Sequence, residues 1–227
     1  MSEYAVRVAP TNSKAERVRK FNVRGVILEM DNLDFILKSL QKIIGRNISE
    51  KEQKKLAGIL KPVKLNKGQY WLKAGEKSEV IAFNISGLLR FFYIDMDGND
   101  VTKYFCLENS IILTSAALTN KESAYYIEAL EDCVLMTADY LAFTELTKDS
   151  AFWLEIIKNE YEKALIYKEE RERSFLLENA TERYKNFIKD YPNTDKRIKL
   201  KYIASYLGIS PVSLSRIRKK LTFVNDN

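Results

Sequence analysis

The sequence predicts an α+β protein: an N-terminal antiparallel β-roll of the jelly-roll type with flanking helices, a long helix, and a C-terminal all-α helix-turn-helix domain. Three observations lead to this prediction. Short apolar strands alternate with turn residues after Pro62, no proline or glycine occurs from Ser150 to Tyr191, and residues 200–221 have the spacing of two short helices around a glycine turn. Strands followed by helices are typical of an α+β chain.

The composition is that of an ordinary globular protein. The chain has 227 residues, of which 46% are hydrophobic and 30% charged, and this length suits one large or two smaller domains. No apolar run approaches the roughly 18 residues of a membrane span. Residues 1–30 lack the apolar stretch and cleavage site of a signal peptide. We therefore expect a cytoplasmic protein without a membrane partner, in which residues 1–30 are a poorly ordered extension.

The absence of histidine limits the chemistry that is open to this chain. It removes the commonest general base, the usual zinc ligand and the commonest haem ligand. Cys106 and Cys133 are too few for a four-thiolate metal site, and we expect both to be buried free thiols. We expect no metal, no cofactor and no enzymatic activity. A cupin enzyme, which also has a small β-barrel, is disfavoured because cupins hold their metal with clustered histidines.

Residues 31–148 are interpreted as a sensor domain. The segment from Asp34 to Leu60 has helical periodicity, and Ser49 with Glu52 fits a capping box at the start of a second helix. Asp97-Gly98 is a strong hairpin signal, because the tight turn needs a positive φ. The expected strands read VKL, QYWLK, EVIAFNI, LLRFFYI, VTKYFCL, AYYIEAL and CVLMTA.

Residues 149–178 are expected to form a long connecting helix. One face carries apolar residues that are candidates for a homodimer interface: Ile157, Tyr161, Ala164 and Leu165. The apolar seam weakens at Lys168 and Arg171, so an ideal coiled coil is not indicated. A helix of this kind either packs in a core or pairs with a second copy.

Residues 179–227 are interpreted as a helix-turn-helix domain. Ala204 supplies the small residue where two helices cross, and Gly208 opens the turn. Ser210 can cap the second helix, with Pro211 in its first turn. The inward positions are apolar: Ile203, Leu207, Ile209, Leu214, Ile217 and Leu221.

The second helix has a basic outward face, which predicts binding to double-stranded DNA. Residues 181–227 contain 11 basic and 4 acidic side chains, a net charge of +7, as expected for a segment that contacts a polyanion. Arg216 is the best candidate for reading a guanine edge, beside Ser213 and Val212. The remaining candidates are phosphate contacts and the capping serine: Lys201, Ser210, Arg218, Lys219 and Lys220.

The order of these parts resembles the Crp/Fnr family of bacterial transcription regulators. The resemblance covers about residues 34–221 and rests most specifically on YIASYLGISPVSLSRIRKKL, with SAYYIEALEDCVLMTADYLAFTEL in the β-roll. It implies a cyclic-nucleotide-binding-type β-roll and a symmetric dimer. Two recognition helices would then lie about 34 Å apart on a near-palindromic operator.

The sequence departs from the family pattern where a cyclic nucleotide would bind. The stretch 109–114 lacks the Gly-Glu pair of members that bind the nucleotide phosphate, and Ser123 stands in the place of the arginine. A buried phosphate without a cation is costly, so we expect no binding of cyclic AMP in the usual way. Another small-molecule effector, or none, stays open. Iron–sulfur and haem sensing lack their ligands.

The DNA-binding end also departs from the pattern. Pro211 and Val212 stand where members often carry a charged pair, so a different target sequence is expected. Only six residues follow Leu221, so we expect no hairpin wing. The alternative reading is a cyclic-nucleotide-binding-like regulatory module that acts on a protein partner without binding DNA. Activation, in which RNA polymerase would be a partner, and repression are equally open.

Overall fold

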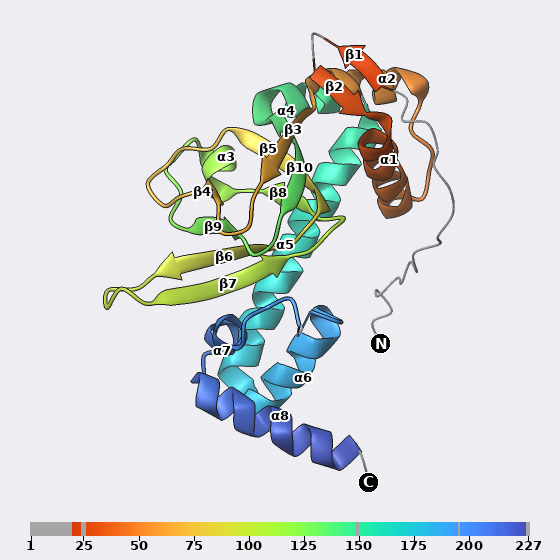
Figure 1. Ribbon diagram of the computed structural model, residues 1–227. Coiled ribbons are helices and arrows are strands. Elements are labelled where there is room, and N and C mark those ends of the chain that lie inside the picture. The colour runs from red at the N-terminus through yellow and green to blue at the C-terminus, as the bar shows by residue number, and fades with distance from the viewer. Residues whose placement is uncertain (1–19, 24–25, 149, 195, 226–227) are drawn as a thin grey trace.

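The computed structural model describes residues 20–23, 26–148, 150–194 and 196–225 (Figure 1). It confirms the predicted α+β class. A pair of four-stranded antiparallel sheets forms the β-roll, and α5 passes behind it to the C-terminal helices. The elements of this second part are α5 (Ala151–Leu177), α6 (Ala180–Asp190), α7 (Leu200–Leu207) and α8 (Pro211–Asn225).

Most strands of the β-roll pair with a strand that is distant in the sequence. The first sheet has the order β3-β10-β5-β8 and the second has the order β4-β9-β6-β7. The strands of the first are β3 (Lys61–Leu65), β10 (Cys133–Asp139), β5 (Val80–Ser86) and β8 (Ile111–Leu113). The strands of the second are β4 (Tyr70–Leu72), β9 (Tyr126–Ala129), β6 (Leu89–Ile94) and β7 (Asp100–Cys106).

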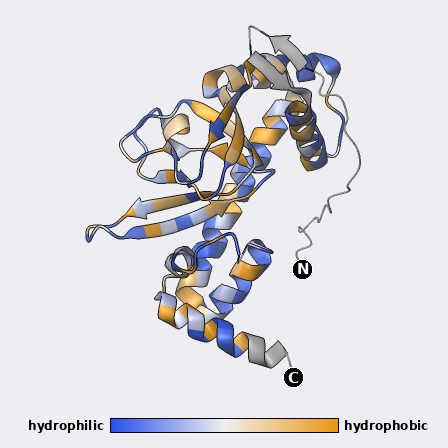
Figure 2. Ribbon diagram, in the orientation of Figure 1, coloured by the Kyte–Doolittle hydropathy of each residue, from blue (hydrophilic) through white to orange (hydrophobic). Residues whose placement is uncertain are grey.

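The alternation of side chains along the strands creates separate core layers. Ala82 and Leu135 point between the sheets, whereas Phe83 and Met136, one residue further along, belong to the cluster under the helices. The two central strands of the first sheet, β5 and β10, are coloured mostly as hydrophobic in Figure 2, because both of their faces are buried. The first sheet therefore lies between the second sheet and a helical layer.

The helical layer covers the outer face of the first sheet. It is built from α1 (Met30–Ile44), α2 (Glu50–Ile59), α4 (Tyr140–Lys148) and the start of α5. The predicted capping box is present, since the Ser49 side chain accepts from the backbone of Glu52 and the Glu52 side chain accepts from that of Ser49. Trp153 of α5 is completely buried in this layer.

Four of the described elements were not predicted, and two of them lie in the β-roll. β8 is only three residues long and shows no alternation of its own, and the five-residue helix α3 (Ser115–Thr119), capped by Thr114, follows it. The other two lie in residues 1–30, the segment that was expected to be an extension. β1 (Lys20–Val23) and β2 (Val26–Glu29) pair as antiparallel strands, whereas residues 1–19 lie outside the described residues. The strands contain the β-branched residues Val23, Val26 and Ile27, which suits such pairing.

The second sheet is covered on its outer face by the C-terminal helical unit. Phe105 and Leu130 of the β-roll share one buried cluster with Tyr202 and Leu207 of α7. Among the described residues, none of the helices has the length and apolarity needed to cross a membrane.

Candidate nucleic-acid interface

The turn between α7 and α8 has the geometry that the sequence predicts. Gly208 ends α7 in the left-handed region at φ +65°, and the N–H of Ile209 donates to the Ala204 carbonyl at 3.0 Å. The Ser210 hydroxyl accepts the N–H of Ser213 at 3.1 Å and so caps the start of α8. The two helices are therefore joined as a helix-turn-helix.

The inward face of this motif is closely packed. Ala204 is fully buried where the helices meet, and Ile203, Leu207 and Leu214 are buried around it. Ile209, Ile217 and Leu221 are partly buried against the same cluster. The predicted apolar positions thus form the core of the helical unit, which leaves the opposite face of α8 exposed.

The exposed face of α8 is polar and basic. Val212 is 61% exposed, and Arg216, Lys219 and Lys220 are exposed. Val212, Arg216 and Lys219 follow one another at helical spacing and therefore lie on one side of the helix. Ser215 is exposed beside them and was not among the predicted residues, because a single serine gives little signal in a sequence.

Three of the predicted DNA contacts do not lie on this exposed face of α8. Ser213 is partly buried, and its hydroxyl lies 3.0 Å from that of Ser210. Arg218 is partly buried. Lys201 is exposed on α7, but its amine lies 4.9 Å from the ring centre of Tyr202. Burial raises the pKa of Glu128 in the β-roll, and Lys201 is one of the nearby cations that partly oppose this rise.

The long helix is bonded directly to the turn of the motif. Arg171 of α5 donates to the Tyr206 carbonyl at 2.8 Å, and Arg183 of α6 donates to the Leu207 carbonyl at 3.1 Å. Cations at the carbonyl end of a helix are favourable. Arg171, which interrupts the apolar seam in the sequence, thus serves this contact. A polar crevice of about 190 Å³ lies here between α5, α6 and α7.

The predicted dimer residues occupy the middle of α5. Tyr161, Ala164 and Leu165 are exposed, whereas Ile157 is partly buried against the helical layer. Leu154 is 58% exposed and lies two helical turns before Tyr161, so it extends the same stripe although it was not predicted.

The interior of the β-roll is filled by aromatic side chains. Phe91 stacks on Tyr104 with ring centres 4.1 Å apart and lies 5.7 Å from Tyr125. The buried Ser123 donates to the Tyr125 carbonyl at 2.7 Å, and the Tyr125 hydroxyl accepts the N–H of Ser115 at 3.4 Å. The first N–H of α3 is therefore bonded by a side chain of the protein itself.

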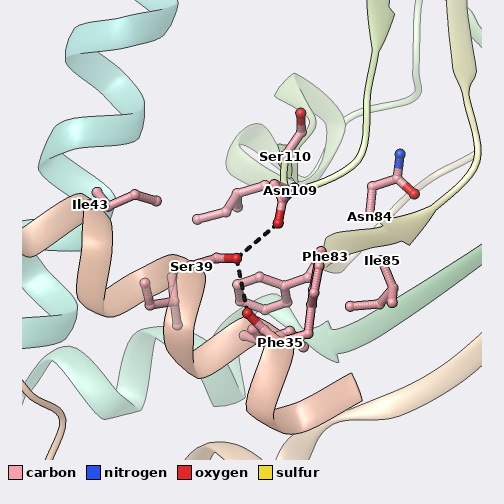
Figure 3. A pocket seen from close by; sticks show the side chains of 11 residues that line it. Phe35, Ser39, Ile43, Phe83, Asn84, Ile85, Asn109 and Ser110 are labelled. Atoms are coloured by element: carbon pink, nitrogen blue, oxygen red, sulfur yellow. Dashed lines mark hydrogen bonds between the residues drawn. The ribbon is translucent and has the colours of Figure 1, made fainter. Parts of the chain in front are cut away.

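A second hollow lies between α1 and the edge of the first sheet (Figure 3). The Ser39 hydroxyl lies there 3.0 Å from the Asn109 side-chain oxygen and 2.9 Å from the Phe35 carbonyl, and either oxygen can accept its proton. The cavity measures about 10 Å³, roughly the space of one water molecule. It is too small for a metabolite.

The two cysteines are buried and free, as predicted. Burial raises the pKa of Cys106 to about 12 and that of Cys133 to about 11. Both sulfurs therefore stay protonated near neutral pH, where the reactive form of a cysteine is the thiolate.

Comparison with solved structures identifies the fold. FixK2 from Bradyrhizobium japonicum matches with a TM-score of 0.65 and 16% identity over 74% of this chain and 86% of its own. The c-di-GMP responsive global regulator CLP from Xanthomonas campestris matches with a TM-score of 0.62 and 13% identity, over 78% and 93% of the two chains. A mutant of CooA from Carboxydothermus hydrogenoformans matches with a TM-score of 0.61 and 16% identity, over 82% and 84%.

No family model matches the sequence, and no curated protein matches it. The likeness is therefore one of structure. The chain has the fold of the Crp/Fnr regulators across most of its length, with a cyclic-nucleotide-binding-like β-roll, a long helix and C-terminal helices.

Proposed function

We propose that this protein is a sequence-specific DNA-binding transcription regulator of the Crp/Fnr type, which binds a near-palindromic operator as a homodimer. The observation that carries the proposal is the exposed basic face of α8 on a packed helix-turn-helix. Such a helix fits the major groove of B-DNA, where base edges are distinguishable.

Arg216 is the proposed base-reading residue. It is exposed between Val212 and Lys219 on the outward face of α8, and a guanidinium can bond both acceptors of a guanine edge. Val212 supplies an apolar surface for a thymine methyl. Lys219 and Lys220 supply phosphate contacts that add affinity without sequence choice.

A symmetric pairing of two α5 helices would place two copies of α8 on one DNA face. The exposed stripe that contains Tyr161 and Leu165 supports this pairing. The operator would then have two half-sites about 34 Å, or one helical turn, apart.

Cyclic AMP is not the proposed effector. Tyr125 and Ser123 bond to the protein where family members that bind the nucleotide are expected to hold its phosphate, and stacked rings fill the β-roll. Isothermal titration calorimetry with cyclic AMP and cyclic GMP should show no saturable heat at micromolar concentration. Tight, stoichiometric binding of either nucleotide would contradict this part of the proposal.

Selection of bound duplexes from a random DNA pool tests the function. The full chain is used at a low and a high salt concentration, without added effector. We expect a two-fold symmetric motif to be enriched, with weaker recovery at high salt because phosphate contacts release counterions. Recovery of salt-sensitive but sequence-independent binding alone would contradict the proposal.

A further inference from the structure

The helical C-terminal unit and the second sheet of the β-roll share one hydrophobic core. The ring of Phe105 on β7 lies 5.6 Å from that of Tyr191 and 6.1 Å from that of Phe187. Leu88 and Leu130 of the β-roll belong to the same buried cluster. Packing on the β-roll therefore fixes the orientation of the helical unit, in addition to its connection through α5.

The outer edge of β7 is bonded by side chains of the helical unit. β7 is the last strand of its sheet, so one of its edges has no partner among the strands that the structure describes. The Ser205 hydroxyl of α7 accepts the N–H of Thr102 at 2.8 Å and donates to the Asp100 carbonyl at 2.9 Å. Covering an edge in this way satisfies its backbone groups and ties α7 to one register along β7.

A fully buried arginine lies at this junction. Arg90 of β6 is 0% exposed, and its guanidinium carbon lies 4.4 Å from the ring centre of Phe92 and 3.8 Å from that of Tyr202 on α7. Its Nη1 donates to Asp100 at 2.8 Å and lies 3.7 Å from Glu128. A buried arginine needs such partners, because an unpaired buried charge is strongly destabilising.

A second arginine bridges the two parts near the surface. Arg197, in the loop between α6 and α7, donates through Nε to Glu131 at 3.0 Å and through Nη1 to Glu108 at 3.3 Å. The hydrogen bonds that Arg197 donates, first to Glu131 and then to Glu108, raise the pKa of Arg197. Both glutamates belong to turns of the β-roll, and all three side chains are about one-third exposed. We call Arg197, Glu108 and Glu131 the Arg197 triad.

We propose that Arg90 and Arg197 are positioning residues for DNA binding: they hold the helix-turn-helix on the β-roll in the orientation that presents α8, so that the protein binds its operator without an effector. This inference rests on the proposed function. In the docked arrangement the basic face of α8 is uncovered, so the arrangement is compatible with DNA binding. If the protein is held in its binding-competent state, no fraction of it occupies orientations that cannot bind, and its apparent affinity is not reduced.

The proposal predicts different effects on the binding of two kinds of DNA duplex. A duplex with two half-sites requires both recognition helices at a fixed separation, whereas a duplex with one half-site requires a folded helix-turn-helix alone. Loosening the Arg197 triad should therefore weaken binding to the two-half-site duplex and leave the single half-site almost unchanged.

The experiment measures the dissociation constants of both duplexes, taken from the selected motif, for four proteins. Arg197→Glu places three carboxylates together and should weaken two-half-site binding about tenfold or more, with less than about a twofold change on the single half-site. Arg197→Glu with Glu131→Arg restores opposite charges and should recover the wild-type ratio. Arg46→Glu, a charge reversal at the surface pair with Glu155, is the matched control and should keep that ratio.

Arg197→Gln, which removes the ion pairs without adding charge, replaces Arg197→Glu if thermal unfolding shows that the latter is not folded. It should give a smaller change in the same direction. Equal weakening on both duplexes, an unchanged ratio, or tighter binding would each overturn the positioning role. A wild-type protein that selects no sequence would overturn the proposed function and this inference together, whereas specific wild-type binding with an unchanged ratio overturns this inference alone.

Discussion

Arg216 is exposed on a helix whose backbone is held in place by buried neighbours, so its side chain can reach DNA. Leu214 and Ile217 anchor α8 on either side of it in sequence, so the guanidinium projects from a fixed backbone. Arg216→Ala should cost about 1–3 kcal/mol on the preferred duplex and relax discrimination at one base pair. Competition binding against duplexes with each base changed measures both effects.

Lys220→Ala is the matched control for this prediction. It removes an exposed charge from the same helix and should weaken all duplexes to a similar extent, with a smaller salt dependence. An Arg216→Ala protein that retains the wild-type base preference would exclude Arg216 from base reading.

Lys103 gives a residue-scale prediction for pH. Burial, with the nearby charge of Lys168, lowers the pKa of Lys103 to about 8. The rings that face its amine are Tyr93, Tyr104 and Tyr125, whose pKa values are themselves raised by burial, so they stay neutral in this range. Between about pH 8 and the usual lysine value near 10.5 the unfolded chain binds the extra proton, so stability should rise with pH.

Urea unfolding at about pH 7 and about pH 9.5 measures this dependence. Lys103→Met should be more stable than wild type at the lower pH and should lose the rise, because no amine is left to deprotonate. Lys158→Met, at an exposed position of α5, should retain it. A Lys103→Met protein with the wild-type pH dependence would contradict the assignment.

At single positions, the sequence predicted the role of a residue where that role depends on local backbone geometry. Gly208, Ser210 and Ala204 were predicted because a helix-turn-helix requires those residue types at that spacing. The roles of Arg90 and Arg197 were not predictable in this way. Arg90 stands in an apolar strand and Arg197 in a basic loop, and their partners come from segments that only the packed protein brings together.

At the scale of elements, two glycines in turns between strands make a matched pair: Gly87 links β5 to β6 of the other sheet, and Gly98 closes the β6–β7 hairpin. Gly87 and Gly98 both have positive φ, +92° and +80°. A Cβ at Gly87 would lie 2.6 Å from the Asp132 carbonyl oxygen and 2.8 Å from the Cα of Cys133, whereas a Cβ at Gly98 meets nothing within 4 Å. The first substitution therefore adds a backbone clash to the conformational cost.

Gly98→Ala should lower the free energy of unfolding by about 1 kcal/mol, and Gly87→Ala by about 3 kcal/mol or more. Urea denaturation followed by circular dichroism measures both. Equal losses for the two variants would show that the chain relaxes around Gly87 without cost.

The elements that the sequence predicted are those with a repeating pattern or a cap. The strands from VKL to CVLMTA and the helix cap at Ser49 are present. The start of α6 carries a similar signal in the sequence. The Asn179 side chain accepts from the Glu182 N–H and the Glu182 side chain accepts from the Asn179 N–H, a capping box that separates α6 from α5. β8 is different, since three residues carry no period and its partner β5 lies far away in the chain.

At the scale of the whole molecule, the long helix was predictable but its surroundings were not. The sequence indicated an uninterrupted helix with an apolar face, and α5 spans 27 residues. One side of its first turns is buried in the helical layer, and its later part contacts α7 through Arg171. The middle of α5 is exposed, and much of its last part is exposed as well, including Leu176 and Leu177.

The exposed middle of α5 provides a test of the homodimer with two adjacent residues. Leu165 is 59% exposed and Ile166 is 53% exposed, yet the helix turns their side chains about 100° apart. Leu165 shares a face with Tyr161 and Leu154, the stripe proposed to pair, whereas Ile166 does not.

In a symmetric dimer each substitution occurs twice, so Leu165→Glu should reduce the free energy of dimerisation by about 3 kcal/mol or more, which weakens dimerisation at least about a hundredfold. Sedimentation velocity over a concentration series should therefore show monomer for Leu165→Glu where wild type and Ile166→Glu remain dimeric. If Ile166→Glu dissociates and Leu165→Glu does not, the copies pair through a different face of α5, and the two recognition helices would have a different separation on DNA.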